Sequence, residues 1–378
     1  MKSRVAVLRT EPGQVLADYG RLLDLARYRE VLDPGQDLIL KLNLSWTKYF
    51  PACSSQPWQL EGVLGKLLAD GFAPARLLAV ENKTVVTEPV KGARNNRWLP
   101  VLEAKGVGFT PLPGVEWTVY RFRSPLLRLN EIFPDGIEIP KMYIGRSILH
   151  LPTVKTHGHS VTTGAIKNAF GGLLKEVRHY AHKYIHEVMV DLMLMQREIH
   201  PAVFAVMDGT VAGDGAGPRT MTPHVKNLIL ASADSVAIDA VAARLMGFDP
   251  MAIPYLRICH ERGLGVADTR DIEIAGTDIS GVNFGFRTRR SLVIWGDQML
   301  RRGPLRFLEH LALHSPLVVW APFASNLYHD GMWYPTIGRR IIRQFSHTPW
   351  GRLFDERYGP GGGMGQPAGA TAAAAPHA

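Results

Sequence analysis

Residues 147–157 read Ser-Ile-Leu-His-Leu-Pro-Thr-Val-Lys-Thr-His, and this stretch decides the fold class. Ser147 to Leu151 is a short apolar run typical of a buried strand, and Pro152 ends it. The polar residues 153–159 predict a loop, and residues 163–174 predict a helix. The same alternation of strand and helix signals continues on both sides of this unit, so we expect an α/β fold with a mixed, mainly parallel sheet built from βαβ units.

The 378 residues divide by composition into four parts. We expect an N-terminal α/β half (1–145), a motif-bearing α/β half (146–285), an appended, mainly helical extension rich in Arg and Trp (286–358), and a disordered Gly/Ala/Pro tail (359–378). The extension holds 11 Arg, no Lys and 5 acidic residues between Arg287 and Tyr358. An anionic membrane surface or a partner protein fits that charge. The alternative is a lid that packs on the core.

Cysteine content and hydropathy exclude several classes of protein. The two cysteines, Cys53 and Cys259, are too few for a four-cysteine zinc site or an iron–sulfur cluster from this chain alone, and they indicate a reducing cytoplasm. No apolar run reaches the ~18 residues of a membrane-spanning helix. The net charge is +9, but there is no dense basic run and no nucleic-acid motif, so we expect no nucleic-acid partner.

The strongest candidate site follows the strand that ends at Leu151. In parallel sheets, ligands bind beyond the carboxyl ends of the strands. Thr163 could cap the following helix, whose free N–H groups favour an anion; Lys155 and Lys167 add positive charge, and His157 could move protons near neutral pH. The alternative is a basic surface loop with an ordinary helix cap.

Two further segments carry carboxylates. In residues 208–219, Asp208 is followed by glycines that would let a ligand approach the backbone, including Gly215 and Gly217; a tight loop without ligand is the alternative. The pattern is neither a P-loop nor a Rossmann fingerprint. Asp239 lies among apolar residues of a predicted helix, so we expect it to be buried with a partner such as Lys155 or Lys167.

Three histidines suggest a metal site. His179, His182 and His186 are spaced by three and four residues within a helix predicted over 180–197 and its approach, which would place them on one face. Ligation of a transition metal competes with the simpler interpretation of a solvated helical face.

Together these segments resemble a known family, the domain-of-unknown-function family 362 of bacteria and archaea. The resemblance is carried by Leu151–His157, Thr163–Gly171, Met207–Gly209 with Gly215–Pro218, and Ala233–Ala242 with Leu245–Gly247, and it spans roughly residues 5 to 276. Leu40–Asn43 is similar to the family's strand end, which adds Lys41 and Asn43 to the predicted site. The family's association with iron–sulfur modules implies a separate redox partner. Lys167, His157 and His186 also bear a fainter similarity to the pattern of nickel-pincer lactate racemases.

We therefore expect an enzyme, oxidoreductase-like or isomerase-like, that binds an anionic small molecule or cofactor and carries out proton-transfer or redox-linked chemistry. His157, Lys167, Asp208 and Asp239 are the candidate catalytic residues. The candidate ligand-binding residues are Lys41, Asn43, Lys155, Thr163, Asn168, Gly215 and Gly217. The alternatives are a non-catalytic metal or cofactor carrier that uses the three histidines, and a cytoplasmic protein that associates with a membrane surface through residues 286–358.

Overall fold

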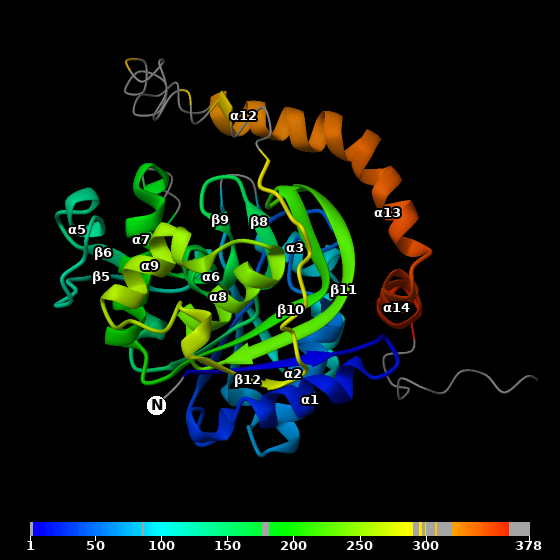
Figure 1. The fold of residues 1–378 in the computed structure, drawn as a ribbon, viewed down its shortest axis with the longest axis horizontal. Helices are drawn as coiled ribbons and strands as arrows, with labels where there is room; N and C mark the ends of the chain where they lie inside the picture. The colour runs from blue at the N-terminus through cyan, green and yellow to red at the C-terminus, as the bar shows by residue number, and fades with distance from the viewer. Residues whose placement is uncertain are drawn as a thin grey trace, which may run out of the picture.

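The computed structural model describes four continuous stretches of the chain: residues 3–84, 87–175, 181–289 and 320–362. They form the predicted α/β fold, with a ten-stranded, mostly parallel sheet and a helical C-terminal segment (Figure 1). Strands from both predicted halves join in this one sheet. The tail predicted beyond Gly362 lies outside the described residues.

The main path of the sheet runs β12-β1-β11-β10-β7-β2-β3-β4, and β8 and β9 branch from β10. Pairing is parallel from β10 through β7, β2 and β3 to β4, whereas β11 is antiparallel to both its neighbours. The strand bounds are β1 (Ser3–Arg9), β2 (Leu38–Lys41), β3 (Leu77–Glu81), β4 (Gly108–Pro111), β7 (Ser147–His150), β8 (Thr153–His157), β9 (Val161–Thr162), β10 (Val203–Ala216), β11 (Thr220–Ser232) and β12 (Ile272–Gly276). A separate hairpin joins β5 (Trp117–Tyr120) to β6 (Ile137–Pro140).

Helices cover both faces of the sheet because alternate strand residues point to opposite sides. In β1, Val5 and Val7 belong to one apolar cluster and Ala6 to the other. One face carries α1 (Val15–Leu25), α2 (Pro57–Ala69) and α4 (Trp98–Ala104), with the short α3 (Pro89–Asn95) beside α4. The other carries α6 (Gly164–Leu173), α7 (Ile185–Ile199), α8 (Ser235–Met246) and α9 (Pro254–Glu261), with the one-turn α5 (Leu129–Ile132).

The prediction of a polar loop over residues 153–159 was wrong in part, because Thr153–His157 form β8. The expectation of a Gly-rich loop over residues 208–219 was also wrong in part: residues 208–216 continue β10, which pairs with β11 as far as Ala216 and Thr220. The glycines make this long hairpin possible. A Cβ on Gly217 would overlap the carbonyl oxygen of Thr156, and one on Gly213 would overlap Met221. Glycine here permits close packing of β8 and β11.

The described part of the C-terminal extension forms a helical arm along one side of the molecule (Figure 1). We call Trp320–Tyr358 the C-terminal arm. It comprises α12 (Trp320–Asn326), a π-helical segment η10 (Leu327–Gly338), α13 (Arg339–Ser346) and α14 (Pro349–Tyr358). Its end is fastened to α2, where Tyr358 donates a hydrogen bond to Glu61 and Trp350 packs against Trp58. None of the described helices is long and apolar enough to cross a membrane.

Candidate functional site

The carboxyl ends of β2 and β3 bring a buried ion pair to the predicted ligand-binding edge. Lys41 is the last residue of β2 and Glu81 the last of β3, and these neighbouring parallel strands place Lys41 Nζ 2.8 Å from Glu81 Oε1. The other carboxylate oxygen of Glu81 accepts the backbone N–H of Leu44. Because Lys41 is already neutralised by Glu81, it supports the loop after β2 more directly than it would hold a ligand.

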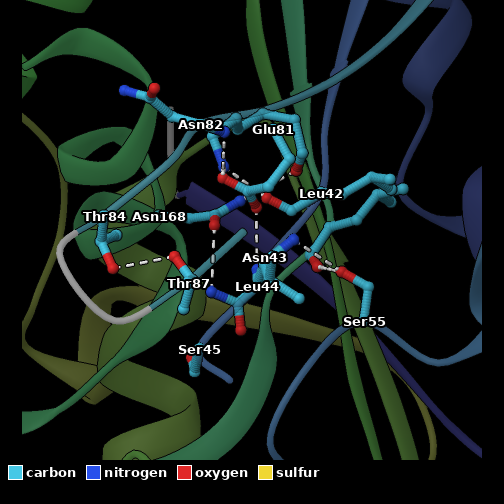
Figure 2. Close-up of polar contacts among 12 residues, drawn as sticks. Leu42, Asn43, Leu44, Ser45, Ser55, Glu81, Asn82, Thr84, Thr87 and Asn168 are labelled. Atoms are coloured by element: carbon cyan, nitrogen blue, oxygen red, sulfur yellow. Dashed lines mark hydrogen bonds and ion pairs between the residues drawn. The ribbon is translucent and has the colours of Figure 1, made fainter. Parts of the chain in front are cut away.

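A chain of amides links this pair to helix α6 (Figure 2). Asn43 Nδ2 donates to Asn168 Oδ1 over 3.3 Å, and the Asn168 amide nitrogen lies 2.9 Å from the Lys41 carbonyl and 3.3 Å from His150 Nδ1. On its other side, His150 Nε2 lies 2.6 Å from Gln196 Oε1. The ring therefore accepts at Nδ1 and donates at Nε2, which is the neutral form. Burial lowers the pKa of His150 to about 3 and keeps it neutral.

Lys155 is a buried cation next to this chain. Its Nζ donates to Asn43 Oδ1 (2.5 Å), Thr153 Oγ1 (2.7 Å) and the Cys53 carbonyl (2.9 Å). These three acceptors use all three ammonium donors, and none of them is a carboxylate. The pKa of Lys155 is lowered to about 7, mainly by burial; Cys53 and Glu81 oppose this lowering, and the positive charge of the nearby Lys167 adds to it. Lys155 thus changes its charge near neutral pH.

His157 ends β8 with a defined tautomer. Its Nδ1 accepts hydrogen bonds from the backbone N–H groups of His159 (3.1 Å) and Ser160 (3.3 Å), so the ring proton resides on Nε2. Burial places the pKa of His157 well below its usual value, and the positive charge of Lys167 adds to that effect. In this environment the ring is a neutral hydrogen-bond donor, and its expected part in proton transfer stays a prediction.

A group of half-buried basic side chains surrounds His157. The His159 ring lies 5.8 Å from the rings of both His157 and His182. The Phe170 ring contacts two basic groups: its centroid lies 5.3 Å from the centroid of the His182 ring and 5.6 Å from Lys167 Nζ. We call His157, His159, Lys167 and His182 the basic cluster. Three of the four remain partly exposed, so a solute can reach them.

The start of helix α6 is occupied from within the protein. Asp239, from α8, accepts the backbone N–H groups of Ala165 (2.5 Å) and Ile166 (3.2 Å). Burial raises the pKa of Asp239 to about 8. Thr163 makes no side-chain cap, and its hydroxyl has no partner in the described structure. We expected Asp239 to pair with Lys155 or Lys167. It binds instead to the N-terminus of α6, where we had expected an external anion.

Asp208, Gly215 and Gly217 all lie in or next to β10, but they face different neighbours. Asp208 points to the α1/α2 face of the sheet, where Tyr19, Trp58 and Thr210 donate hydrogen bonds to it. Gly215 adopts a φ of +101° in the β10–β11 hairpin, and its carbonyl accepts a hydrogen bond from the Thr156 hydroxyl. The Gly217 carbonyl accepts the backbone N–H of Gly158, which lies between His157 and His159. The catalytic and binding roles expected of these three residues stay predictions.

The two described histidines of the predicted metal site, His182 and His186, do not lie on the same helix. His179 lies outside the described residues. His182 precedes α7 and contacts His159 and Phe170, whereas His186 lies in the first turn of α7 and stacks on Tyr255 at 6.1 Å. Within the stretches that the structure describes, no three His, Cys, Asp or Glu side chains are grouped as metal ligands.

Sequence reasoning missed Glu81, His150 and Gln196. A signal existed for Glu81, because it directly follows Leu77–Val80, a short apolar run typical of a strand. His150 was visible inside the apolar strand, but nothing in the sequence indicated Gln196 as its partner, since 46 residues separate them.

The comparisons with known proteins agree with the resemblance that the motifs carry. The chain is 25% identical over 274 residues to a thylakoid-associated protein of Synechocystis sp., a match that covers 70% of this chain and 81% of the relative. The search of solved structures finds no match. The family model of DUF362, a domain of unknown function, matches residues 38–244, more than half of the chain, and includes the strand ends, the basic cluster and Asp239. The chain belongs to the DUF362 family.

Proposed function

We propose that the protein is an enzyme that binds a small anion, a carboxylate or a phosphate, at the basic cluster. The observation that carries the proposal is the buried ammonium group of Lys155 at this edge of the sheet. Its three hydrogen bonds all go to neutral oxygens, those of Asn43, Thr153 and the Cys53 carbonyl. His157 ends the same strand with a neutral ring, and the positive charge of Lys167 lies close enough to lower the pKa of both groups. A buried positive charge that is hydrogen-bonded to neutral groups favours an anionic ligand nearby.

One residue of this edge would orient the ligand, and a second supports proton chemistry. The Nε2–H of His157 would donate a hydrogen bond to an oxygen of the ligand, and the neutral ring is suited to polarise that oxygen without surrendering its own proton. Lys155, whose pKa is about 7, would exchange a proton near neutral pH. We do not include Asp208, because its carboxylate is bound within the α1/α2 face. Redox chemistry with a separate iron–sulfur partner stays a prediction of the family resemblance.

Binding calorimetry with inorganic phosphate, succinate and citrate tests the proposal. We expect at least one of these anions to bind the wild-type chain with a dissociation constant of about 1 mM or below. Removing one charged hydrogen-bond donor is worth about 1.5–3 kcal/mol, so Lys167→Met should weaken that binding by about tenfold or more. The matched control is Lys141→Met, which removes the same charge from an exposed pair with Glu116.

The proposal fails if no anion binds the wild-type chain at about 10 mM. It also fails if Lys167→Met and Lys141→Met retain the same affinity, because binding would then reflect the overall charge of +9 and not the cluster.

A second candidate function is association with a membrane surface from the cytoplasm. We propose it because the Synechocystis relative is named as thylakoid-associated and because the C-terminal arm exposes apolar side chains beside arginines. Cys53 and Cys259 are both free and buried, which is consistent with a reducing compartment. Sedimentation of the purified chain with phospholipid vesicles tests this function.

A further inference from the structure

The C-terminal arm has an inner face that is fixed to the core. Trp46 Nε1 donates a 2.6 Å hydrogen bond to Asp330, and the Trp46 ring packs edge-on against Tyr334 at 5.0 Å. Tyr334 in turn donates to the Tyr49 carbonyl. Trp333 packs on the rings of Trp46 and Phe50. These contacts hold the arm in one orientation, so its opposite face is presented to solvent in a defined way.

The outer face of the arm carries a row of exposed large apolar side chains. Phe323 is 69% exposed, Leu327 54%, Met332 60% and Ile337 47%. Single exposed apolar residues are ordinary, but several on one short segment mark an interaction surface. The inner-face contacts already account for the packing of the arm on the core, so packing does not explain this row.

The unusual winding of the arm aligns the row. Leu327, Met332 and Ile337 are five residues apart and lie within the π-helical segment Leu327–Gly338. In an α-helix, five residues turn the side chain by about 140° away from its predecessor. Hydrogen bonds from i to i+5 widen the turn, so that every fifth residue is offset far less from its predecessor than in an α-helix. The π-helical segment therefore keeps these three side chains on one broad side, and all three are exposed.

The charged side chains that follow the apolar row on its exposed side are all positive. Arg339, Arg340 and Arg343 follow in α13 and are exposed. Asp330 is the single acidic residue in the sequence from Trp320 to Ser346. Its carboxylate faces inward, bonded to Trp46 and 3.8 Å from Lys48. An apolar row continued by arginines is the pattern of helices that lie in the interface of a bilayer with anionic lipids.

We propose that the outer face of the C-terminal arm docks on a bilayer surface that contains anionic lipids. Phe323, Leu327, Met332 and Ile337 enter the headgroup region, and Arg339, Arg340 and Arg343 contact the lipid phosphates. The inference rests on the second proposed function and assigns it to these seven residues. The inner-face contacts with Trp46 and Tyr49 stay intact during docking, because the two faces use different side chains.

Vesicle sedimentation of the full chain tests the assignment. The probes are vesicles of phosphatidylcholine alone and of phosphatidylcholine with phosphatidylglycerol. One variant combines Leu327→Ser with Met332→Ser, and a second combines Arg339→Gln with Arg340→Gln. The matched control is Val119→Ser, since Val119 is also exposed (56%) but lies in β5, away from the arm. Circular dichroism and thermal unfolding establish that each variant is folded.

We expect the wild-type chain and Val119→Ser to bind the anionic vesicles at least tenfold more tightly than the neutral ones. Each arm variant should lose about tenfold or more of the binding to anionic vesicles. If the wild-type chain binds and the arm variants bind equally well, the docking face is wrong while membrane association stands. If the wild-type chain binds no vesicle, both proposals fail.

Two other outcomes would also overturn the assignment. Equal binding to neutral and anionic vesicles would remove the role of the arginines. Sedimentation equilibrium without lipid measures the oligomeric state of the chain. If the wild-type chain is a dimer and the Leu327→Ser/Met332→Ser variant is a monomer, the apolar row binds a second copy of the chain and not a bilayer.

Discussion

Replacing Gly164 with alanine should displace the Asp239 carboxylate from the start of helix α6 and destabilise the fold. A Cβ at this position would overlap all three atoms of the carboxyl group. Gly164 also has a φ of +68°, where alanine costs about 1 kcal/mol or more. Asp239 is buried and cannot move into solvent, so at least one of its two backbone hydrogen bonds must break.

The magnitude follows from these contacts. Because the pKa of Asp239 is about 8, its carboxyl group is mainly neutral near pH 7, and a hydrogen bond to a neutral group contributes about 0.5–1.5 kcal/mol. The backbone cost and one or two lost bonds together give about 1.5–4 kcal/mol. Urea unfolding with linear extrapolation measures the loss. The matched control is Gly65→Ala in α2, where the new Cβ meets no atom within 4 Å; it should stabilise the helix by up to about 1 kcal/mol. A Gly164→Ala protein within about 1 kcal/mol of wild type would refute the internal cap.

Three further predictions concern buried ionisable groups. Glu81→Gln leaves the Lys41 ammonium buried without its counter-ion, so urea unfolding should show a loss of about 3–5 kcal/mol; an unchanged midpoint would contradict the buried pair. The pKa of His150 is lowered to about 3, so the unfolded chain binds a proton that the folded chain refuses. The stability that the neutral His150 ring allows is therefore fully present above about pH 6.5. The free energy of unfolding decreases as the pH falls from there towards 3. Stability measured between pH 6.5 and 4 should therefore fall less steeply in His150→Asn, by up to about 1.4 kcal/mol per pH unit, and parallel curves would exclude a neutral buried ring. Because the pKa of Lys155 is about 7, anion affinity should decrease as the pH rises from 6 to 8, and this decrease should be absent in Lys155→Met; calorimetry at three pH values checks it.

The fold was predictable from local patterns. Strand and helix alternation indicated the mainly parallel sheet, and Asp234 is of a residue type that commonly caps helices: it accepts the N–H groups of Val236 and Ala237 at the start of α8. The β10–β11 hairpin was not predictable in the same way. Its glycines have low strand propensity, and they are accommodated only because β8 and β11 pack closely against them.

The sequence indicated which residues meet at the candidate site, but not which of them pair with one another. Lys41, Asn43, Lys155, His157 and Asn168 do meet at one edge, as strand ends of a parallel sheet should. Which carboxylate neutralises which group depends on contacts between distant segments: Asp239 caps a helix 74 residues earlier in the chain. The sequence also did not indicate that His182 and His186 lie on different elements. The periodicity predicted a helix from residue 180, whereas α7 begins at Ile185.

The protonation state of His157, measured with and without an anion, is the sharpest test of the proposed anion site. Long-range ¹H–¹⁵N correlation spectra report the protonation of each imidazole nitrogen, and the spectrum of His157→Gln assigns the signal. At pH 7 the account predicts a neutral ring with its proton on Nε2, because two backbone N–H groups occupy Nδ1. Adding phosphate or succinate should shift the Nε2 signal saturably. A ring that is charged at pH 7, or a signal that no anion moves, would contradict the account.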